Sequence, residues 1–200
     1  MGMAVRSEHV CQLFDSDDSR AEAVAAFLAA GLDAGEYVIA VPRPVHWTSI
    51  AARLESRGIR VQAAIEQGRL AMFDAMTTLS RISPRGRLNP FAFNEAVAAA
   101  LQPASGGRIR AWGEMVDLLA ERGDVAEALE LEELWNHVGE MVPLTLMCSY
   151  SAAHFVSAST HRGLRDICMA HTDVRRDPQD PLASWILTAA HYGDGSSSLH

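Results

Sequence analysis

The sequence predicts an α/β fold, a three-layer sandwich in which helices cover both faces of a mainly parallel central sheet. Short runs of apolar residues, bounded by turn residues, alternate along the chain with longer segments of helical periodicity. Strands that alternate with helices in this way form parallel sheets, because each crossover returns the chain to the same edge. Ligands of such sheets bind beyond the carboxyl ends of the strands, so we expect a site there.

The order of the elements follows from these patterns. Strands are expected at residues 9–14, 37–41, 70–73, 108–112 and 144–150, with a brief one at 59–61. Helices are expected from about residue 19 to 31 and at 44–57, 62–67, 90–101, 115–121, 125–141 and 161–171. Several boundaries carry helix signals: Gly31 follows the first helix, Asn89 and Pro90 begin another, and Asp124 is an N-cap.

Length and composition indicate an ordinary globular domain. The chain has 200 residues, 48% of them hydrophobic, and a formal net charge of −8. No cluster of basic residues is present to neutralise phosphates, which argues against direct binding to nucleic acid. The apolar runs are too short for a membrane span. The three cysteines, Cys11, Cys148 and Cys168, cannot all pair, so a reducing, cytoplasmic location is expected.

The composition also predicts a boundary near the C-terminus. Residues 1–171 are expected to form the folded domain, and residues 172–200 a tail. The tail begins with Asp, Pro and Arg, continues with an apolar patch, and ends with Gly, Asp and Ser. The patch at 182–190 predicts a short docking helix, and the last residues are expected to be disordered.

The segment after strand 37–41 argues against phosphate chemistry. A central strand followed by a loop and a helix is where a nucleotide-binding protein places the motif G-x-x-x-x-G-K-[ST]. The loop here is Pro42-Arg43-Pro44-Val45-His46-Trp47-Thr48, which has no glycine and has Trp47 in place of the lysine. Its two prolines remove two backbone donors. We therefore expect no catalytic residue and no cofactor, although Glu114 at a strand end leaves an atypical ATPase open as an alternative.

Six dispersed motifs occur in order along the chain. They are His9-x-Cys11-x-x-Phe14, Gly31-Leu32-x-x-Gly35-Glu36, Gly68-x-Leu70 with Asp74, Ile109-Arg110-x-x-Gly113-Glu114-Met115, Glu132 with Asn136, and Cys148-x-Tyr150. Together they resemble the MEDS domain, the methanogen/methylotroph sensory domain, from about His9 to His171. The resemblance implies a degenerate RecA-like fold without a functional Walker A loop, and a role in sensing rather than catalysis.

The resulting hypothesis is a small-ligand sensory domain in bacterial signal transduction or transcription control. MEDS domains are often attached to a DNA-binding or histidine kinase module, and no such module is recognisable here. The signal is therefore expected to pass to a separate histidine kinase or transcription regulator. The alternative from another class is a ligand-independent interaction module that docks a kinase, a sigma-factor regulator or a second copy of the chain.

Seven residues are the predicted contacts of an unknown small molecule. They are Glu114, Glu132, Asn136, Asp74, His46, Tyr150 and Arg43. Glu132 and Asn136 are four residues apart, so they share one line of their helix and form either a ligand-facing notch or a polar clasp. Glu114 has the alternative of accepting backbone or arginine hydrogen bonds. For the others the alternatives are a surface histidine, a helix cap at Asp74, and packing of the tyrosine ring.

A mixed metal site can be drawn from five residues, but the sequence does not favour one. The five are His9, Cys11, Cys148, Cys168 and His171. His9 and Cys11 alternate onto the same face of their strand, and Cys168 and His171 share a helical face. No close C-x-x-C pair is present, however, and single buried cysteines usually act as small hydrophobes. We therefore predict no metal site.

Overall fold

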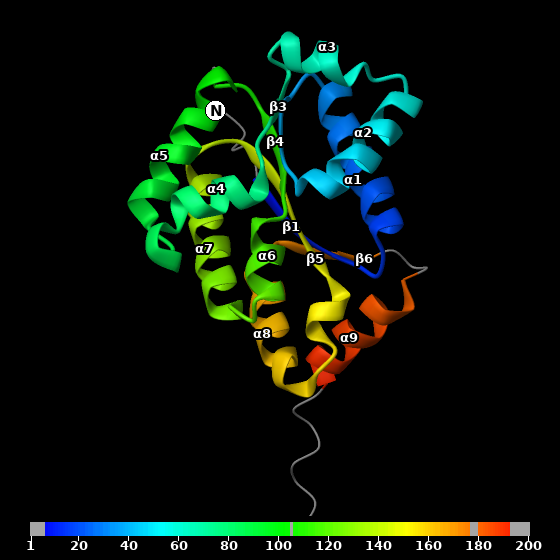
Figure 1. Cartoon of the computed structure of the whole chain (residues 1–200), viewed down its shortest axis with the longest axis vertical. Helices are drawn as coiled ribbons and strands as arrows, with labels where there is room; N and C mark the ends of the chain where they lie inside the picture. Colours follow the sequence, from blue (N-terminus) through cyan, green and yellow to red (C-terminus); the bar gives the residue numbers. More distant parts are fainter. Residues whose placement is uncertain (1–6, 105, 177–179, 193–200) are drawn as a thin grey trace, which may run out of the picture.

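The computed structural model describes residues 7–104, 106–176 and 180–192. In these residues six strands form one sheet in the order β3-β2-β4-β5-β1-β6, and every pair of neighbours is parallel (Figure 1). The strands are β1 (Glu8–Phe14), β2 (Tyr37–Val41), β3 (Leu70–Met72), β4 (Ile109–Gly113), β5 (Leu144–Ser151) and β6 (Asp173–Arg176). All carboxyl ends therefore lie at one edge of the sheet.

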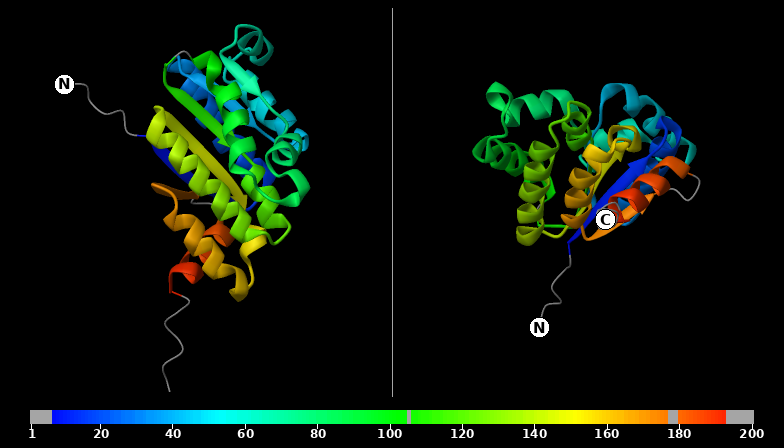
Figure 2. Two further views of the ribbon diagram at one scale, coloured as in Figure 1. Left: turned by 90° about the vertical axis from the view of Figure 1, so that its left-hand side faces the viewer. Right: turned by 90° about the horizontal axis from the view of Figure 1, so that it is seen from below.

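Helices connect these strands and cover both faces of the sheet. They are α1 (Asp17–Asp33), α2 (Pro44–Ser56), α3 (Val61–Glu66), α4 (Ala75–Ile82), α5 (Pro90–Leu101), α6 (Met115–Glu121), α7 (Val125–Met141), α8 (Ala158–Met169) and α9 (Pro181–Tyr192). Short 3₁₀ turns occur at η1 (Pro84–Gly86), η2 (Gln102–Ala104) and η3 (Ala152–Phe155). Figure 2 shows the helices of the first third of the chain and the α4–α7 group on opposite sides of the sheet. The predicted three-layer α/β sandwich is confirmed.

Alternation along the strands sends successive side chains to two separate cores. In β2, Val38 and Ala40 join the core under α1, α2 and α3, whereas Ile39 and Val41 join the core under the later helices. Both kinds of residue are buried, which is why the strand reads as a continuous apolar run.

Three details of the predicted elements differ from the structure. β2 is not the central strand, because it lies second from one edge while β4 and β5 occupy the middle of the sheet. The brief strand expected at 59–61 is absent there, since Val61 already begins α3. Helix α4 was not predicted, although Ala75, Leu79 and Ile82 bury one face of it at helical spacing.

The described residues beyond 171 include a strand and a helix that belong to the fold. β6 pairs with β1 at the edge of the sheet, and α9 occupies the position of the predicted docking helix. Two backbone N–H groups at the start of α9, those of Leu182 and Ala183, donate to the Asp15 carboxylate at 2.8 and 2.7 Å. Ala183, Ile186 and Ala190 are buried in the core. The disorder predicted for the last residues of the tail concerns a segment outside the described residues.

Two of the motifs meet at the amino ends of the strands. Arg110 Nε donates to Glu36 Oε2 at 2.6 Å, and its guanidinium lies over the Phe27 ring. A Cβ at Gly31 would lie 2.6 Å from Arg110 Cδ, so only glycine leaves room for this arginine. Gly35 has a φ of 70°, which L side chains rarely adopt, and it turns the chain toward Glu36. These motif residues hold α1 to β2 and β4.

The helices also bear on membrane association. Within the described parts of the chain, none is both long enough and apolar enough to cross a bilayer.

Candidate functional site

The seven predicted ligand contacts fall in three places. Glu114, His46 and Arg43 meet at the carboxyl ends of β2 and β4. Glu132, Tyr150 and Asn136 belong to a second group between the sheet, α7 and the end of α8. Asp74 stands apart as the N-cap of α4, where it is half-buried and accepts from Thr77 N at 2.6 Å. The hydrogen bond with Thr77 lowers the pKa of Asp74.

Glu114 is a completely buried carboxylate whose oxygens both have partners. Its Oε2 accepts from the backbone N–H of Arg43 at 2.7 Å, and its Oε1 accepts from His46 Nδ1 at 2.6 Å. Arg20, on α1, adds an ion pair at 3.5 Å. The carboxylate therefore ties α1, the start of α2 and the end of β4 together.

The Arg43 side chain continues this network to the next strand. Its guanidinium donates to Asp117 at 2.7 Å and to Glu121 at 2.8 Å. Asp117 also accepts from Ser151 N at 2.8 Å and lies 3.0 Å from His154 Nε2. Burial opposes ionisation of Asp117, but His154, Ser151 N and Arg43 outweigh it and lower the pKa of this carboxyl below its ordinary value.

The second buried carboxylate, Glu132, lies in a cluster of histidine, cysteine and tyrosine. Its Oε2 is 3.1 Å from His9 Nε2, and its Oε1 is 3.3 Å from His171 Nε2. Cys148 Sγ is 3.4 Å from His9 Nε2, and the Tyr150 hydroxyl donates to Glu132 Oε1 at 2.5 Å. The four potential metal-binding atoms of His9, Glu132, Cys148 and His171 all lie within 4.8 Å of one another.

Burial shapes the electrostatics of this cluster. It opposes ionisation of Glu132, but His171 and His9 hold the pKa of this carboxyl well below its usual range. Burial and the nearby Glu132 raise the pKa of the Cys148 thiol and of the Tyr150 hydroxyl. Burial opposes protonation of His171, yet Glu132 raises the pKa of that imidazole.

The remaining two cysteines lie beside this cluster. Cys11 is the register partner of Cys148 in the β1–β5 pair, and its thiol shares a hydrogen bond with Cys168. That hydrogen bond, together with burial, raises the pKa of Cys11, and the same bond lowers the pKa of Cys168. The five residues considered as metal ligands from the sequence are thus neighbours in space.

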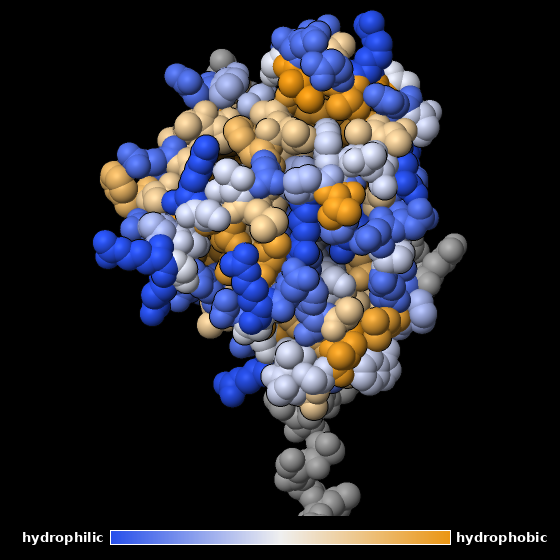
Figure 3. Space-filling view, in the orientation of Figure 1, coloured by the Kyte–Doolittle hydropathy of each residue, from blue (hydrophilic) through white to orange (hydrophobic). Residues whose placement is uncertain are grey.

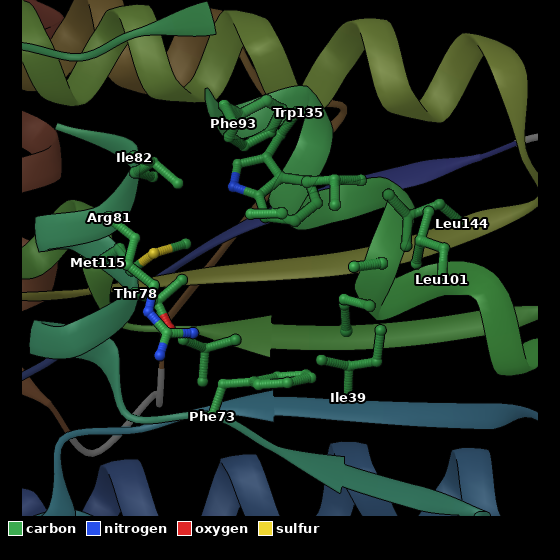
Figure 4. Close-up of a pocket in the computed structure, with 16 residues that line it drawn as sticks. Ile39, Phe73, Thr78, Arg81, Ile82, Phe93, Leu101, Met115, Trp135 and Leu144 are labelled. Carbon is green, nitrogen blue, oxygen red and sulfur yellow. The ribbon is translucent and has the colours of Figure 1, made fainter. Parts of the chain in front are cut away.

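An apolar cavity of about 220 Å³ lies between the sheet and the helices α4, α5 and α7 (Figure 4). Phe93 and Trp135 close it on the helical side, and Ile39 and Phe73 lie opposite. Their neighbours are mostly alanine, leucine and valine, with Thr78 and Arg81 at one end. None of the seven predicted ligand contacts lines this cavity.

A second hollow lies on the other side of Trp135. This open groove of about 480 Å³ is lined by His9, Asn136 and His171 together with Trp135. Glu132, Trp135 and Asn136 are spaced by three and four residues on α7 and so share one side of that helix. The same helix therefore contributes to the buried cluster, the cavity and the groove.

The carboxyl edge of the sheet lacks the parts of a phosphate cradle. In the described residues, none of the connections from a strand to the following helix contains a glycine. This holds for the loop after β2 and for Asp15-Ser16, which joins β1 to α1. Glu114, the acid considered for ATP hydrolysis, is bound by groups of the chain itself.

A comparison of the sequence with protein families decides the family. The model of the MEDS family, described as the methanogen/methylotroph, DcmR sensory domain, matches residues 8–172. The chain belongs to the MEDS family. The resemblance inferred from the dispersed motifs is confirmed, and membership in this family indicates a sensory role.

Solved structures add a likeness in fold. The MEDS domain is similar to a KaiC-like protein from the hyperthermophilic archaeon Pyrococcus horikoshii, with a TM-score of 0.52 and 14% sequence identity. The match covers 72% of this chain and 61% of that protein. It supports the predicted RecA-like fold and carries no information about activity. A comparison with curated proteins finds no match.

Sequence reasoning missed two parts of these sites. It did not include Arg20, Asp117 or His154 in the network around Glu114, because these residues come from three other elements. It also missed the cavity, one wall of which is α4. The signal for α4 was present in the spacing of Ala75, Leu79 and Ile82, which is helical.

Proposed function

We propose that this MEDS domain senses a small, mainly apolar molecule that binds in the cavity beside Trp135. The observation that carries the proposal is the cavity itself, whose walls come from three strands and four helices and are almost entirely apolar. The sensory role indicated by the family supports it. In this proposal Glu114, His46 and Arg43 serve the fold, by holding the strand ends in place.

The size of the cavity limits the ligand. An apolar cavity of about 150 Å³ is enough to bind benzene, whereas pockets for drug-sized ligands begin at about 300 Å³. At about 220 Å³, this cavity fits a molecule slightly larger than benzene. Thr78 and Arg81 at one end offer a hydroxyl and a guanidinium to a polar substituent.

Sensing requires that the ligand favour one of two conformations of the domain. A ligand in the cavity contacts α4, α5 and α7 at once, so it can stabilise one arrangement of these helices on the sheet. We propose that a separate signalling protein, such as a histidine kinase or a transcription regulator, binds one of the two arrangements. On the face in Figure 3, apolar residues form separate patches divided by hydrophilic ones, which gives less support to a ligand-independent docking module.

The test is to fill the cavity and measure binding of small probes. Ala96 lines the cavity, and Ala98 is exposed on the same helix, α5, and does not line it. Benzene, toluene and cyclohexane should raise the thermal unfolding midpoint of the wild type and of Ala98→Phe, and should have no effect on Ala96→Phe. Xenon should be found beside Trp135 in crystals under pressure. The proposal is contradicted if the probes stabilise the two variants equally. It is also contradicted if they stabilise neither the variants nor the wild type.

A further inference from the structure

The donor atoms of the Glu132 cluster have the spacing of metal ligands. A tetrahedral ion with bonds of 2.0–2.3 Å to nitrogen, oxygen and sulfur keeps neighbouring donors roughly 3.3–3.6 Å apart. Here His9 Nε2 is 3.1 Å from Glu132 Oε2 and 3.4 Å from Cys148 Sγ, and His171 Nε2 is 3.3 Å from Glu132 Oε1. The four donor atoms all lie within 4.8 Å of one another, so the most widely separated donors must move closer together to surround one ion.

The hydrogen bonds of both imidazoles leave Nε2 as the binding atom. His171 Nδ1 donates to the carbonyl of Ile167 at 2.7 Å. His9 Nδ1 lies 2.8 Å from Asn136 Oδ1, and this amide is oriented because its NH₂ group donates to Ala170 O at 2.8 Å. Each neutral imidazole therefore has its Nε2 lone pair aimed into the cluster. Metal-bound histidines are oriented in the same way by a hydrogen bond at the other nitrogen.

Two buried atoms in the cluster have no hydrogen-bond partner. They are Glu132 Oε2 and His171 Nε2, on side chains that are both fully buried. Tyr150 donates to the other carboxylate oxygen, Oε1, and so fixes the orientation of Glu132. Buried polar atoms without partners are costly, and both residues belong to the set whose potential metal-binding atoms lie within 4.8 Å of one another.

We propose that His9, Glu132, Cys148 and His171 bind a divalent transition-metal ion of the Zn²⁺ type. Two imidazoles, one thiolate and one carboxylate form a ligand set of intermediate softness that suits Zn²⁺ and Co²⁺. The thiolate and carboxylate together carry two negative charges, which a divalent ion neutralises inside the protein. The four ligands come from β1, α7, β5 and the segment after α8, so the ion joins elements far apart in sequence.

The ion has a route to this place from solvent. The open groove of about 480 Å³ is lined by His9 and His171 themselves and by Asn136. The His9 side chain retains 7% of its surface exposed, and it forms the boundary between groove and cluster. None of the four proposed ligands lines the apolar cavity, so the metal site does not rest on the proposed function.

The competing arrangement is a buried ion pair between Glu132 and a protonated His171, without any metal. Metal titration of the full chain distinguishes the two. Protein stripped with a chelator is titrated with Co²⁺ and then with Zn²⁺. The proposal predicts one equivalent of Co²⁺ per chain, with the visible bands of a tetrahedral ion and a thiolate charge-transfer band that Zn²⁺ removes.

Three variants assign the ligands. Cys148→Ser should abolish the charge-transfer band, whereas Cys168→Ser, the same change at the neighbouring thiol, should keep it. Asn136→Ala should retain one equivalent and weaken Zn²⁺ affinity about 10- to 100-fold, because it frees the His9 ring. Circular dichroism checks that each apo variant is folded. Folded wild type without bound Co²⁺, or a charge-transfer band that survives Cys148→Ser, overturns the proposal.

Discussion

The two fully buried glutamates, Glu114 and Glu132, have opposite surroundings. Glu114 accepts a backbone N–H and an imidazole N–H and pairs with the Arg20 guanidinium, so both of its oxygens are bound within the chain. Glu132 has one oxygen bound by Tyr150 and one without a hydrogen-bond donor, facing two histidines and a thiol. Both carboxylates are completely buried, but only Glu132 has an oxygen that can still accept a hydrogen bond or bind a cation.

This difference separates a structural role from a binding role. A buried charge whose partners are complete holds elements together and has nothing left to offer a ligand. A buried charge with an unpartnered oxygen is costly unless another group completes it. Glu114 is therefore read as a clasp at the strand ends, and Glu132 as one member of a receptor for a cation.

The largest expected effect comes from removing Glu114. Glu114→Ala leaves the buried Arg20 and the half-buried His46 without this carboxylate, so we expect a loss of about 3–5 kcal/mol in the free energy of unfolding. Glu121→Ala is the control, because it removes a half-exposed partner of Arg43 and should cost at most about 1 kcal/mol. Urea unfolding at neutral pH measures both. If the two variants lose equal amounts of unfolding free energy, Glu114 does not hold the strand ends together in the way described.

A smaller effect sharpens the contrast between the two glutamates. Zn²⁺ at a hundred times its dissociation constant should stabilise the wild type by about 2.7 kcal/mol. Glu114→Gln should keep this increment, since the change lies outside the metal ligands. Glu132→Gln should lose most of it, because the amide carries no charge for the ion. Urea titrations with and without Zn²⁺ give the increments, and an undiminished one in Glu132→Gln contradicts the assignment.

The smallest effect concerns Asp117, at the edge of the Glu114 network. Because its folded pKa is lowered, ionised Asp117 stabilises the protein above its unfolded pKa near 3.8, and the contribution disappears as pH falls through the folded value. Asp117→Asn should therefore cost about 1–3 kcal/mol at pH 7. The unfolding free energies of wild type and variant should converge as the pH is lowered below 4. If the difference in unfolding free energy between wild type and variant does not change with pH, ionised Asp117 is not the source of the stabilisation.

The fold was predictable because its signals are local. Alternating strands and helices, the N-cap at Asn89 with Pro90, and the buried runs at 37–41 and 144–150 each depend on neighbouring residues. Helix α4 escaped because it has eight residues, includes two adjacent threonines and ends before Pro84. Short segments with β-branched residues carry weak helical propensity, so packing decides them.

The sites were less predictable because they depend on contacts between distant elements. Alternation along β1 places His9 and Cys11 on the same face of the sheet, and that much follows from the sequence. The pairing of Cys11 with Cys148, which brings Cys148 to this face, is visible only in the structure. The approach of Glu132 and His171 depends on where α7 and α8 cross the sheet. No spacing along the chain encodes that crossing, nor does it indicate that Glu114 would be completely enclosed.

Helix α7 has a consequence for how the two proposed sites relate. Its residues Glu132, Trp135 and Asn136 reach the cluster, the cavity and the groove from a single rigid rod. A sideways or axial shift of α7 therefore changes the cluster, the cavity and the groove together. Thermodynamic reciprocity then requires that any influence of the ion on ligand affinity be matched by an equal influence of the ligand on ion affinity. In the two proposals taken together, the ion and the ligand therefore act on the domain through the same helix.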